Sequence, residues 1–232
     1  MTISKPAARI QLEEGLERTC GIDYSSQGLP TSGESPRHSA VLILFGELDD
    51  VDAEAHCSSV SDDLDVLLTR RAAHMRHHPG QIAFPGGGAE PGDADEIATA
   101  LREAEEETGL DPAGVDILGT LTPTYMQVSN NLVTPVIGWW RRTSPVRADQ
   151  SESHEVMRVP VADLLNPAAR GVSVLQHESR TFRGAAFQLP ARFGGDIVWG
   201  FTGMLLSSIF DGVGWAEPWS REREFPVKPG RS

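Results

Sequence analysis

The sequence has few cysteines, no long apolar run and a shortage of positive charge. Its 232 residues include only two cysteines, Cys20 and Cys57, so no disulfide framework can be built, and we expect free thiols in a reducing compartment. No run approaches the ~20 apolar residues that span a bilayer, and the first residues lack an apolar segment of signal-peptide length. These absences predict a cytoplasmic protein with no membrane partner.

The charge balance excludes a class of partners. Lysine and arginine number 20 against 33 aspartates and glutamates, which gives a formal net charge of -13. Such a chain is repelled by nucleic acid and anionic membranes, so we expect neither as a partner. Hydrophobic residues make up 39%, an ordinary share for a globular protein, and the length suits one sizeable domain. The composition is compatible with a homodimer.

The chain is organised around one stretch, Gly80–Leu110. A short apolar run and two Pro-Gly turns lead into a segment of strong helix formers, which predicts a helix from about Ala94 to Thr108. Asp93 is expected to cap its first turn with Glu96 as the reciprocal partner, and Gly109 to end it. The predicted buried face consists of Ile97, Ala98, Leu101 and Ala104.

Glutamates crowd the end of this helix. Glu103, Glu106 and Glu107 stand at positions i, i+3 and i+4, so their carboxylates share one face and repel one another. The helix dipole also disfavours negative charge at this end. A divalent cation such as Mg²⁺ or Mn²⁺ would reverse this repulsion, because both ions prefer oxygen ligands. The alternative is a solvated acidic face, which is the usual meaning of a charge run.

A basic segment, Arg70–His78, interrupts this acidic chain. Its arginines would suit a phosphate-binding loop, since guanidinium groups form paired hydrogen bonds with phosphate oxygens. The alternative is a solubilising loop beside a strand. Its three histidines lack a fourth ligand nearby, which disfavours zinc.

The remaining pattern predicts short strands around this core. Apolar runs bounded by turns predict strands at 40–48, 64–69, 115–122, 133–140, 179–187 and 193–199, a short helix or turn at 161–165, and a helix at 202–210. Segments 125–131 and 149–156 are predicted to be loops. Residues 1–37 are expected to form a peripheral N-terminal arm, partly disordered, and residues 215–232 a mobile C-terminal tail.

The second half of the central stretch resembles the Nudix box, whose pattern is G-x5-E-x7-R-E-U-x-E-E-x-G-U, where U is aliphatic. The segment Arg102–Leu110, REAEEETGL, fits every fixed position of that half. The first half departs from the pattern. Five residues after Gly87 comes Asp93 in place of glutamate, and eight residues, not seven, separate Asp93 from Arg102.

The segment before the box resembles the coenzyme A diphosphatase branch of the same superfamily. Residues 67–87, LLTRRAAHMRHHPGQIAFPGG, are similar to the pattern LLTxRSxxLRxHxGQxxFPGG, with Ala72 in place of serine and Met75 in place of leucine. That branch also carries the longer loop with aspartate. Later segments extend the resemblance over about residues 38–212.

The resemblance implies a fold and a metal site. The fold would be an α/β/α sandwich with a mixed β-sheet between helices, formed by residues 38–214. Glu103, Glu106 and Glu107 would hold Mg²⁺ or Mn²⁺, and the backbone carbonyl of Gly87 would complete the coordination. Arg102 would pair with a carboxylate and orient the box.

It also implies a reaction, the hydrolysis of a diphosphate linkage. Coenzyme A, a small-molecule diphosphate, would be cut into 4'-phosphopantetheine and adenosine 3',5'-bisphosphate. Arg71 and Arg76 would contact the anionic substrate. Tyr125 would lie near it, or serve as a structural plug. Glu106 and Glu155 are the candidates for the group that takes the proton from water.

Three alternatives stay open. Glu155, like Glu152, is equally compatible with a solvated loop carboxylate. The substrate would, in a second reading, be another nucleoside diphosphate derivative, such as a dinucleotide cofactor or ADP-ribose. In a third, the domain would be a catalytically silent Nudix domain that binds a nucleotide, although the complete set of box glutamates argues against it.

Overall fold

The computed structural model describes residues 7–19, 35–47, 53–72, 80–127, 129–149, 153–177 and 180–228. Arg76, Glu152 and Cys20 lie outside these ranges, as do the three histidines of the basic segment. None of the described helices is both long enough and apolar enough to cross a bilayer.

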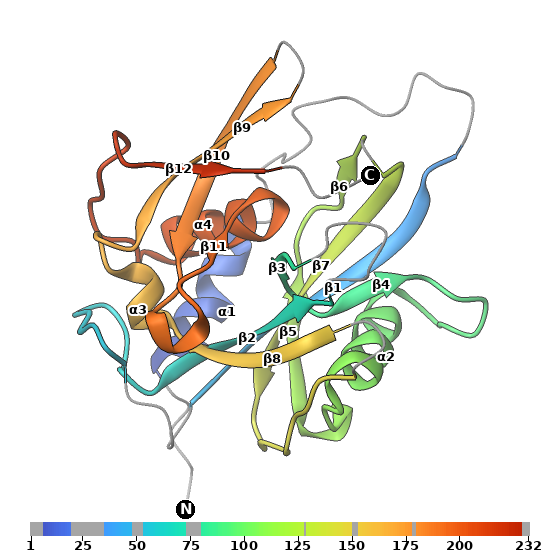
Figure 1. Ribbon diagram of the computed structural model, residues 1–232. Helices are drawn as coiled ribbons and strands as arrows, with labels where there is room; N and C mark the ends of the chain where they lie inside the picture. The colour runs from blue at the N-terminus through green and yellow to red at the C-terminus, as the bar shows by residue number, and fades with distance from the viewer. Residues whose placement is uncertain are drawn as a thin grey trace, which may run out of the picture.

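An eight-stranded mixed sheet forms the centre of the fold (Figure 1). Its main path runs β3 (Ile82–Ala83), β2 (Leu64–Arg71), β1 (Arg37–Glu47), β7 (Asn131–Trp140) and β5 (Val115–Thr120), while β4 (Gly86–Gly88), β6 (Thr124–Met126) and β8 (Ser153–Pro160) pair with β1, β7 and β2. Strands β1 and β7 are parallel, with Arg37 opposite Asn131 and Phe45 opposite Trp139. The other pairs in this sheet are antiparallel.

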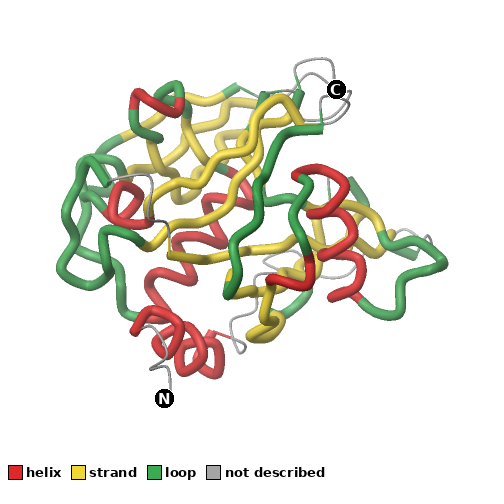
Figure 2. Tube along the Cα trace, turned by 90° about the horizontal axis from the view of Figure 1, so that it is seen from below, coloured by secondary structure: helices red, strands yellow, loops and turns green. Residues whose placement is uncertain are grey.

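Helices cover both faces of this sheet. Along β1, Leu42 and Leu44 pack with α2 (Glu96–Thr108), whereas Ile43 and Phe45 pack with α1 (Ala7–Thr19) and α4 (Gly200–Val213). Side chains alternate between the faces of a strand, so one run of apolar residues supplies both cores. Figures 1 and 2 show α2 apart from the α1 and α4 pair. The predicted α/β/α sandwich with a mixed β-sheet is confirmed.

A second, four-stranded sheet was not predicted. Its order is β11 (Ile197–Val198), β10 (Arg180–Gln188), β9 (Arg170–His177) and β12 (Glu224–Val227), and α3 (Val161–Leu165) precedes it in the chain. The strand expected at 193–199 is instead a 3-10 turn (Ala191–Phe193) followed by the short β11. Gly194 and Gly195 both have positive φ, 87° and 69°, which ends extended structure at this point.

The C-terminal segment is part of the fold, so the expectation of a mobile tail is wrong for residues 215–228. Trp215 is fully buried and packs edge-on against Phe45, with ring centroids 5.7 Å apart. Strand β12 runs parallel to β9, with Glu224 opposite Val172. The Pro- and charge-rich composition hid these long-range contacts.

The N-terminal helix is also part of the core, contrary to the expectation of a peripheral arm. Leu12 is fully buried in the cluster that contains α4, and a Cβ on Gly15 would lie 2.4 Å from Val213, so the two helices approach closely there. Arg9 ties α1 to β5 by an ion pair with Asp116, at 2.7 Å between Nη1 and Oδ2. Residues 7–19 therefore belong to the same body as the sheet.

This packing predicts different costs for two substitutions on α1. Leu12→Ala removes a fully buried side chain, and we expect the free energy of unfolding to fall by about 2–5 kcal/mol. Ile10, on the same helix, is 39% exposed, so Ile10→Ala should change it by under about 1 kcal/mol. Urea denaturation of both variants measures the difference. Equal effects would mean that α1 is not docked as described.

Candidate functional site

Helix α2 carries the clustered glutamates, and local interactions fix both its ends. The predicted N-cap was wrong. Asp95, not Asp93, caps the helix, and its Oδ1 accepts a hydrogen bond from the Ala98 N–H at 2.8 Å. The predicted C-cap is confirmed, because Gly109 is left-handed, with φ 68°, and its N–H donates to the Glu105 carbonyl.

Asp93 has a different partner, Arg102. The Arg102 Nε and Nη2 atoms each donate to one carboxylate oxygen of Asp93 at 3.0 Å, which is a two-pronged ion pair. Asp93 also accepts from the backbone N–H of Glu90 and the hydroxyl of Thr99, both at 2.9 Å. These hydrogen bonds, with that of Arg102 the strongest, hold the pKa of Asp93 well below its usual range.

The same guanidinium reaches two of the glutamates. Arg102 Nη1 donates to Glu103 Oε1 at 3.0 Å and to Glu106 Oε2 at 3.1 Å, while Nη2 donates to the carbonyl of Gly88 at 2.9 Å. The resemblance implied that Arg102 pairs with a carboxylate, and the structure shows it pairing with three. The hydrogen bond that Arg102 donates to Asp93 is the first cause of the raised pKa of Arg102.

Gly87 lies directly against the first glutamate. A Cβ at this position would lie 2.5 Å from the Glu103 carboxylate, closer than any real side chain permits. The Glu103 side chain is 14% exposed, whereas that of Glu106 is 60% exposed. Glu107 is buried, at 5%. The helix therefore presents its carboxylates in three environments: Glu103 lies against β4, Glu106 faces solvent and Glu107 is buried.

The carboxylates are not drawn together tightly in this conformation. Within the described ranges, no group of three or more His, Cys, Asp or Glu side chains is close enough to hold a metal ion. The assignment of Glu103, Glu106, Glu107 and Gly87 to a metal site thus stays a prediction.

The structure does not bring Glu155 to the α2 glutamates. The loop expected at 149–156 is a strand from Ser153 onward, and Glu155 lies on it. Its neighbour Val156 packs on the α2 side of the sheet, whereas Met157 packs on the α1 and α4 side. Because side chains alternate, Glu155 shares the face of Met157, away from α2.

Glu155 is instead paired with an arginine from the basic segment. Arg70 Nε donates to Glu155 Oε2 at 2.9 Å, and the same guanidinium binds Asp196 and the carbonyl of Phe193. Arg70 thus joins β2 and β8 to the turn before β11. The desolvation of Arg70 opposes its charge, yet the hydrogen bonds that it donates to Asp196 and Glu155 leave its pKa raised.

Two other predicted substrate contacts, Arg71 and Tyr125, lie on strands β2 and β6 rather than on α2. Arg71 ends β2, opposite Ser153, and its Nε is shielded from solvent without a hydrogen-bond partner in the described part of the chain. Tyr125 lies on β6 rather than in a loop, and its hydroxyl donates to Asn130 Oδ1 at 3.0 Å. This bond is consistent with the structural alternative for Tyr125. Arg76 lies outside the described residues.

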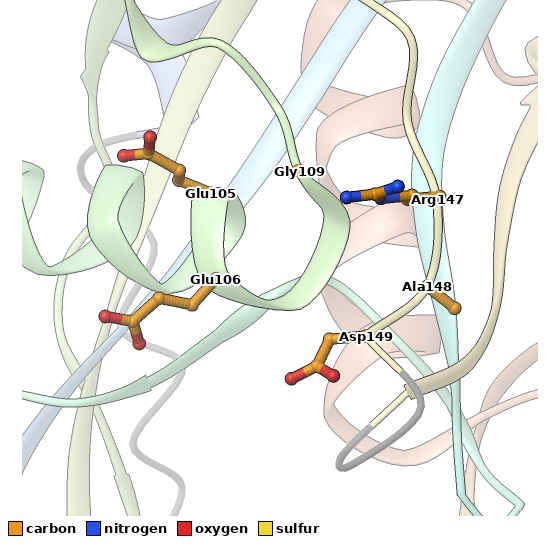
Figure 3. A pocket seen from close by; sticks show the side chains of 6 residues that line it. All are labelled: Glu105, Glu106, Gly109, Arg147, Ala148 and Asp149. Atoms are coloured by element: carbon orange, nitrogen blue, oxygen red, sulfur yellow. The ribbon is translucent and has the colours of Figure 1, made fainter.

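A cleft of about 570 Å³ opens beside the C-terminal end of α2 (Figure 3). It is lined by Glu105, Glu106, Gly109, Arg147, Ala148 and Asp149. The segment opposite the helix is held by backbone hydrogen bonds, from Arg147 N–H to the Thr108 carbonyl at 2.8 Å and from Asp149 N–H to the Glu107 carbonyl at 3.0 Å. These bonds satisfy carbonyls that the helix itself leaves unpaired. Sequence reasoning missed this segment, because its residues carry no local motif.

The fold and the carboxylate-bearing helix together define a class of protein, and comparison with known proteins agrees. The family model for the NUDIX domain matches residues 53–177. The chain belongs to the NUDIX domain family.

Curated relatives include the uncharacterized Nudix hydrolase NudL of Escherichia coli (strain K12), which is 45% identical over 101 residues. NudL of Shigella boydii serotype 4 is 46% identical over the same length. Each match covers 44% of this chain and 52% of the relative, so the chain spans about half the length of the curated relatives it matches.

Solved structures with a similar fold include a MutT/nudix family protein from Enterococcus faecalis. Its TM-score is 0.45 at 18% identity, over 92% of this chain and 76% of that one. A Nudix hydrolase from M. smegmatis, RenU, gives a TM-score of 0.41 at 22% identity, over 54% and 71% of the two chains.

The close approach at Gly87 predicts a sharp contrast between neighbouring glycines. In Gly87→Ala the new methyl group would displace the Glu103 carboxylate, and we expect Mn²⁺ affinity to fall by about 10-fold or more, in line with lost support at metal sites. Gly88→Ala is the matched control, since a Cβ there meets nothing within 4 Å. Isothermal titration with Mn²⁺ measures both. Equal affinities in the two variants would remove Glu103 from the metal site.

The Asp93–Arg102 pair predicts a pH-dependent contribution to stability. The pKa of Asp93 is lower in the folded chain than in the unfolded one, so the pair stabilises the fold above about pH 4. That contribution is lost as the pH falls from there toward the folded-state pKa. The melting temperature of Asp93→Asn should therefore lie below that of the wild type at pH 7, and the gap should narrow below about pH 4. A gap that is constant with pH would contradict the ion pair.

Proposed function

We propose that the protein is a divalent-cation-dependent hydrolase of diphosphate linkages, with coenzyme A or one of its derivatives as the substrate. The observation that carries the proposal is the position of Arg102, which joins Asp93 to Glu103 and Glu106 beside β4. Family membership supports the reaction class. The substrate rests on the resemblance of residues 67–87 to the coenzyme A diphosphatase branch.

The donor atoms fit Mg²⁺ or Mn²⁺. All side-chain candidates offer carboxylate oxygens, which these hard cations prefer. Gly87 leaves room for the Glu103 carboxylate, because a Cβ at this position would lie 2.5 Å from it. Glu103, Glu106, Glu107 and the Gly87 carbonyl would hold the ion. When bound, it would neutralise phosphate charge and make a water molecule more acidic.

Separate roles in the reaction are assigned to Glu106 and Arg102. Glu106 takes a proton from the attacking water, because its carboxylate is the most exposed to solvent of the three box glutamates Glu103, Glu106 and Glu107. The water oxygen forms a bond to one phosphorus, and the bridging P–O bond breaks, leaving the second phosphate as the leaving group. Arg102 holds Glu103 and Glu106 in place and does not contact the substrate.

Of the two candidate bases, the geometry favours Glu106. Glu155 lies on the opposite face of the sheet from α2 and is paired with Arg70. Such a pairing suits a structural role at the junction of the two sheets. Arg71 and Arg76 remain the proposed contacts for the anionic substrate.

A panel of diphosphates tests the substrate. Coenzyme A, ADP-ribose and a dinucleotide cofactor are each incubated with Mg²⁺ or Mn²⁺, and products are separated by chromatography. We expect adenosine 3',5'-bisphosphate from coenzyme A, with the highest kcat/KM of the panel. Cleavage of the others alone would overturn the substrate, and tight nucleotide binding with no cleavage would overturn the hydrolase.

A pair of substitutions on α2 tests the site. Glu106→Gln should lower kcat by about 10²–10⁴-fold, because a positioned base contributes that much to proton transfer. Glu96→Gln is the matched control, as Glu96 is an exposed carboxylate in the first turn of the same helix. It should keep wild-type turnover. Full activity in Glu106→Gln would exclude it as the base.

A further inference from the structure

We propose that Arg147 binds an anionic group of the substrate in the cleft at the end of α2. This assignment rests on the proposed function and adds a substrate contact outside the box and the segment before it. Neither the box pattern nor the pattern of residues 67–87 extends to this position.

The position of Arg147 is fixed relative to the glutamates. Its backbone N–H donates to the Thr108 carbonyl, in the last turn of α2. Its aliphatic part lies near Gly109. A Cβ added to this glycine would lie 3.9 Å from the arginine Cγ, which is an ordinary van der Waals contact. Figure 3 shows the guanidinium extending along the cleft toward this glycine, while Glu105 and Glu106 leave the helix on its other side. The backbone of Arg147 is therefore held at the cleft by its hydrogen bond to α2.

The charge of Arg147 is available for a ligand. Nearby arginines of the same segment are already paired, Arg141 with Asp116 and Arg142 with Asp111. Among the residues that the structure describes, the Arg147 guanidinium has no ion pair and no side-chain hydrogen bond. A cation that faces a cleft without a partner is suited to an anion from outside the chain.

The rest of the lining decides what kind of ligand fits. The other charged side chains at the cleft are Glu105, Glu106 and Asp149, all acidic. A free anion would be repelled by them, whereas a diphosphate that carries a divalent cation would not. A phosphate oxygen would face Arg147. The volume of about 570 Å³ lies in the range of small-molecule sites and suits a nucleotide-sized ligand.

Arg147 would contact a phosphate group whose negative charge is already present in the free substrate. The arginine stands beside Gly109, which follows Glu103 by six residues and Glu106 by three. Its interaction with the substrate is therefore present before and during the reaction. Such a contact lowers KM and leaves kcat nearly unchanged.

Binding of a diphosphate that cannot be hydrolysed tests the assignment directly. The probe is α,β-methylene-ADP with Mg²⁺, in which carbon replaces the bridging oxygen, and its Kd is measured by calorimetry. We expect Arg147→Ala to weaken binding by about 10-fold or more, the size expected for a charge-assisted hydrogen bond. Arg147→Lys should recover part of the loss, because it keeps the charge without the fork. Arg142→Ala, in the same segment, should bind as the wild type does.

Kinetics with the best substrate of the diphosphate panel supply the second readout. Arg147→Ala should raise KM with little change in kcat, and its melting temperature should match that of Arg142→Ala. Unchanged probe affinity in Arg147→Ala would overturn the assignment, as would an equal loss in Arg142→Ala. If the wild type binds the probe through Arg147 but cleaves no diphosphate, the hydrolase proposal fails and the Arg147 contact stands.

Discussion

One guanidinium group, that of Arg102, connects the parts of the site. It donates to Asp93 in the loop before α2, to Glu103 and Glu106 on the helix, and to the carbonyl of Gly88 on β4. The last two turns of α2 would otherwise collect negative charge at the helix end that least tolerates it. Arg102 offsets part of this repulsion and fixes the loop, the strand and the helix in one arrangement.

Arginine compensation recurs across this acidic chain. With a formal net charge of -13, isolated carboxylates would repel one another over most of the surface. Instead, Arg9 joins Asp116 between α1 and β5, and Arg70 joins Glu155 and Asp196 between the two sheets. Each of these arginines ties together segments that are distant in sequence. Arg147, by contrast, meets no carboxylate in the described residues.

Local features of the fold could be predicted from the sequence. Strong helix formers and Gly109 fixed the body and end of α2, and short apolar runs fixed β1, β2 and β7. Features that depend on distant partners could not be predicted. Asp93 reads as an N-cap by its spacing, but its carboxylate is already bound by Arg102, so Asp95 caps the helix.

The face on which Glu155 lies was equally hidden. In a strand, a shift of one residue moves a side chain to the other side of the sheet, and the register is set by the partner strand. Here β8 pairs with β2 so that Glu155 stands opposite Arg70. The tail and the N-terminal helix were misjudged for a related reason, since Trp215 and Leu12 are buried by elements far along the chain.

This chain departs from the box pattern at Asp93. Aspartate is one methylene shorter than the glutamate of the pattern. The loop here is one residue longer, with eight residues between Asp93 and Arg102. Both Asp93 oxygens nevertheless receive hydrogen bonds from Arg102 at 3.0 Å, and Glu90 and Thr99 hold the same carboxylate from the loop and the helix. In this chain Asp93 therefore binds the same arginine that reaches Glu103 and Glu106, from a loop that differs from the pattern in length and in its acid.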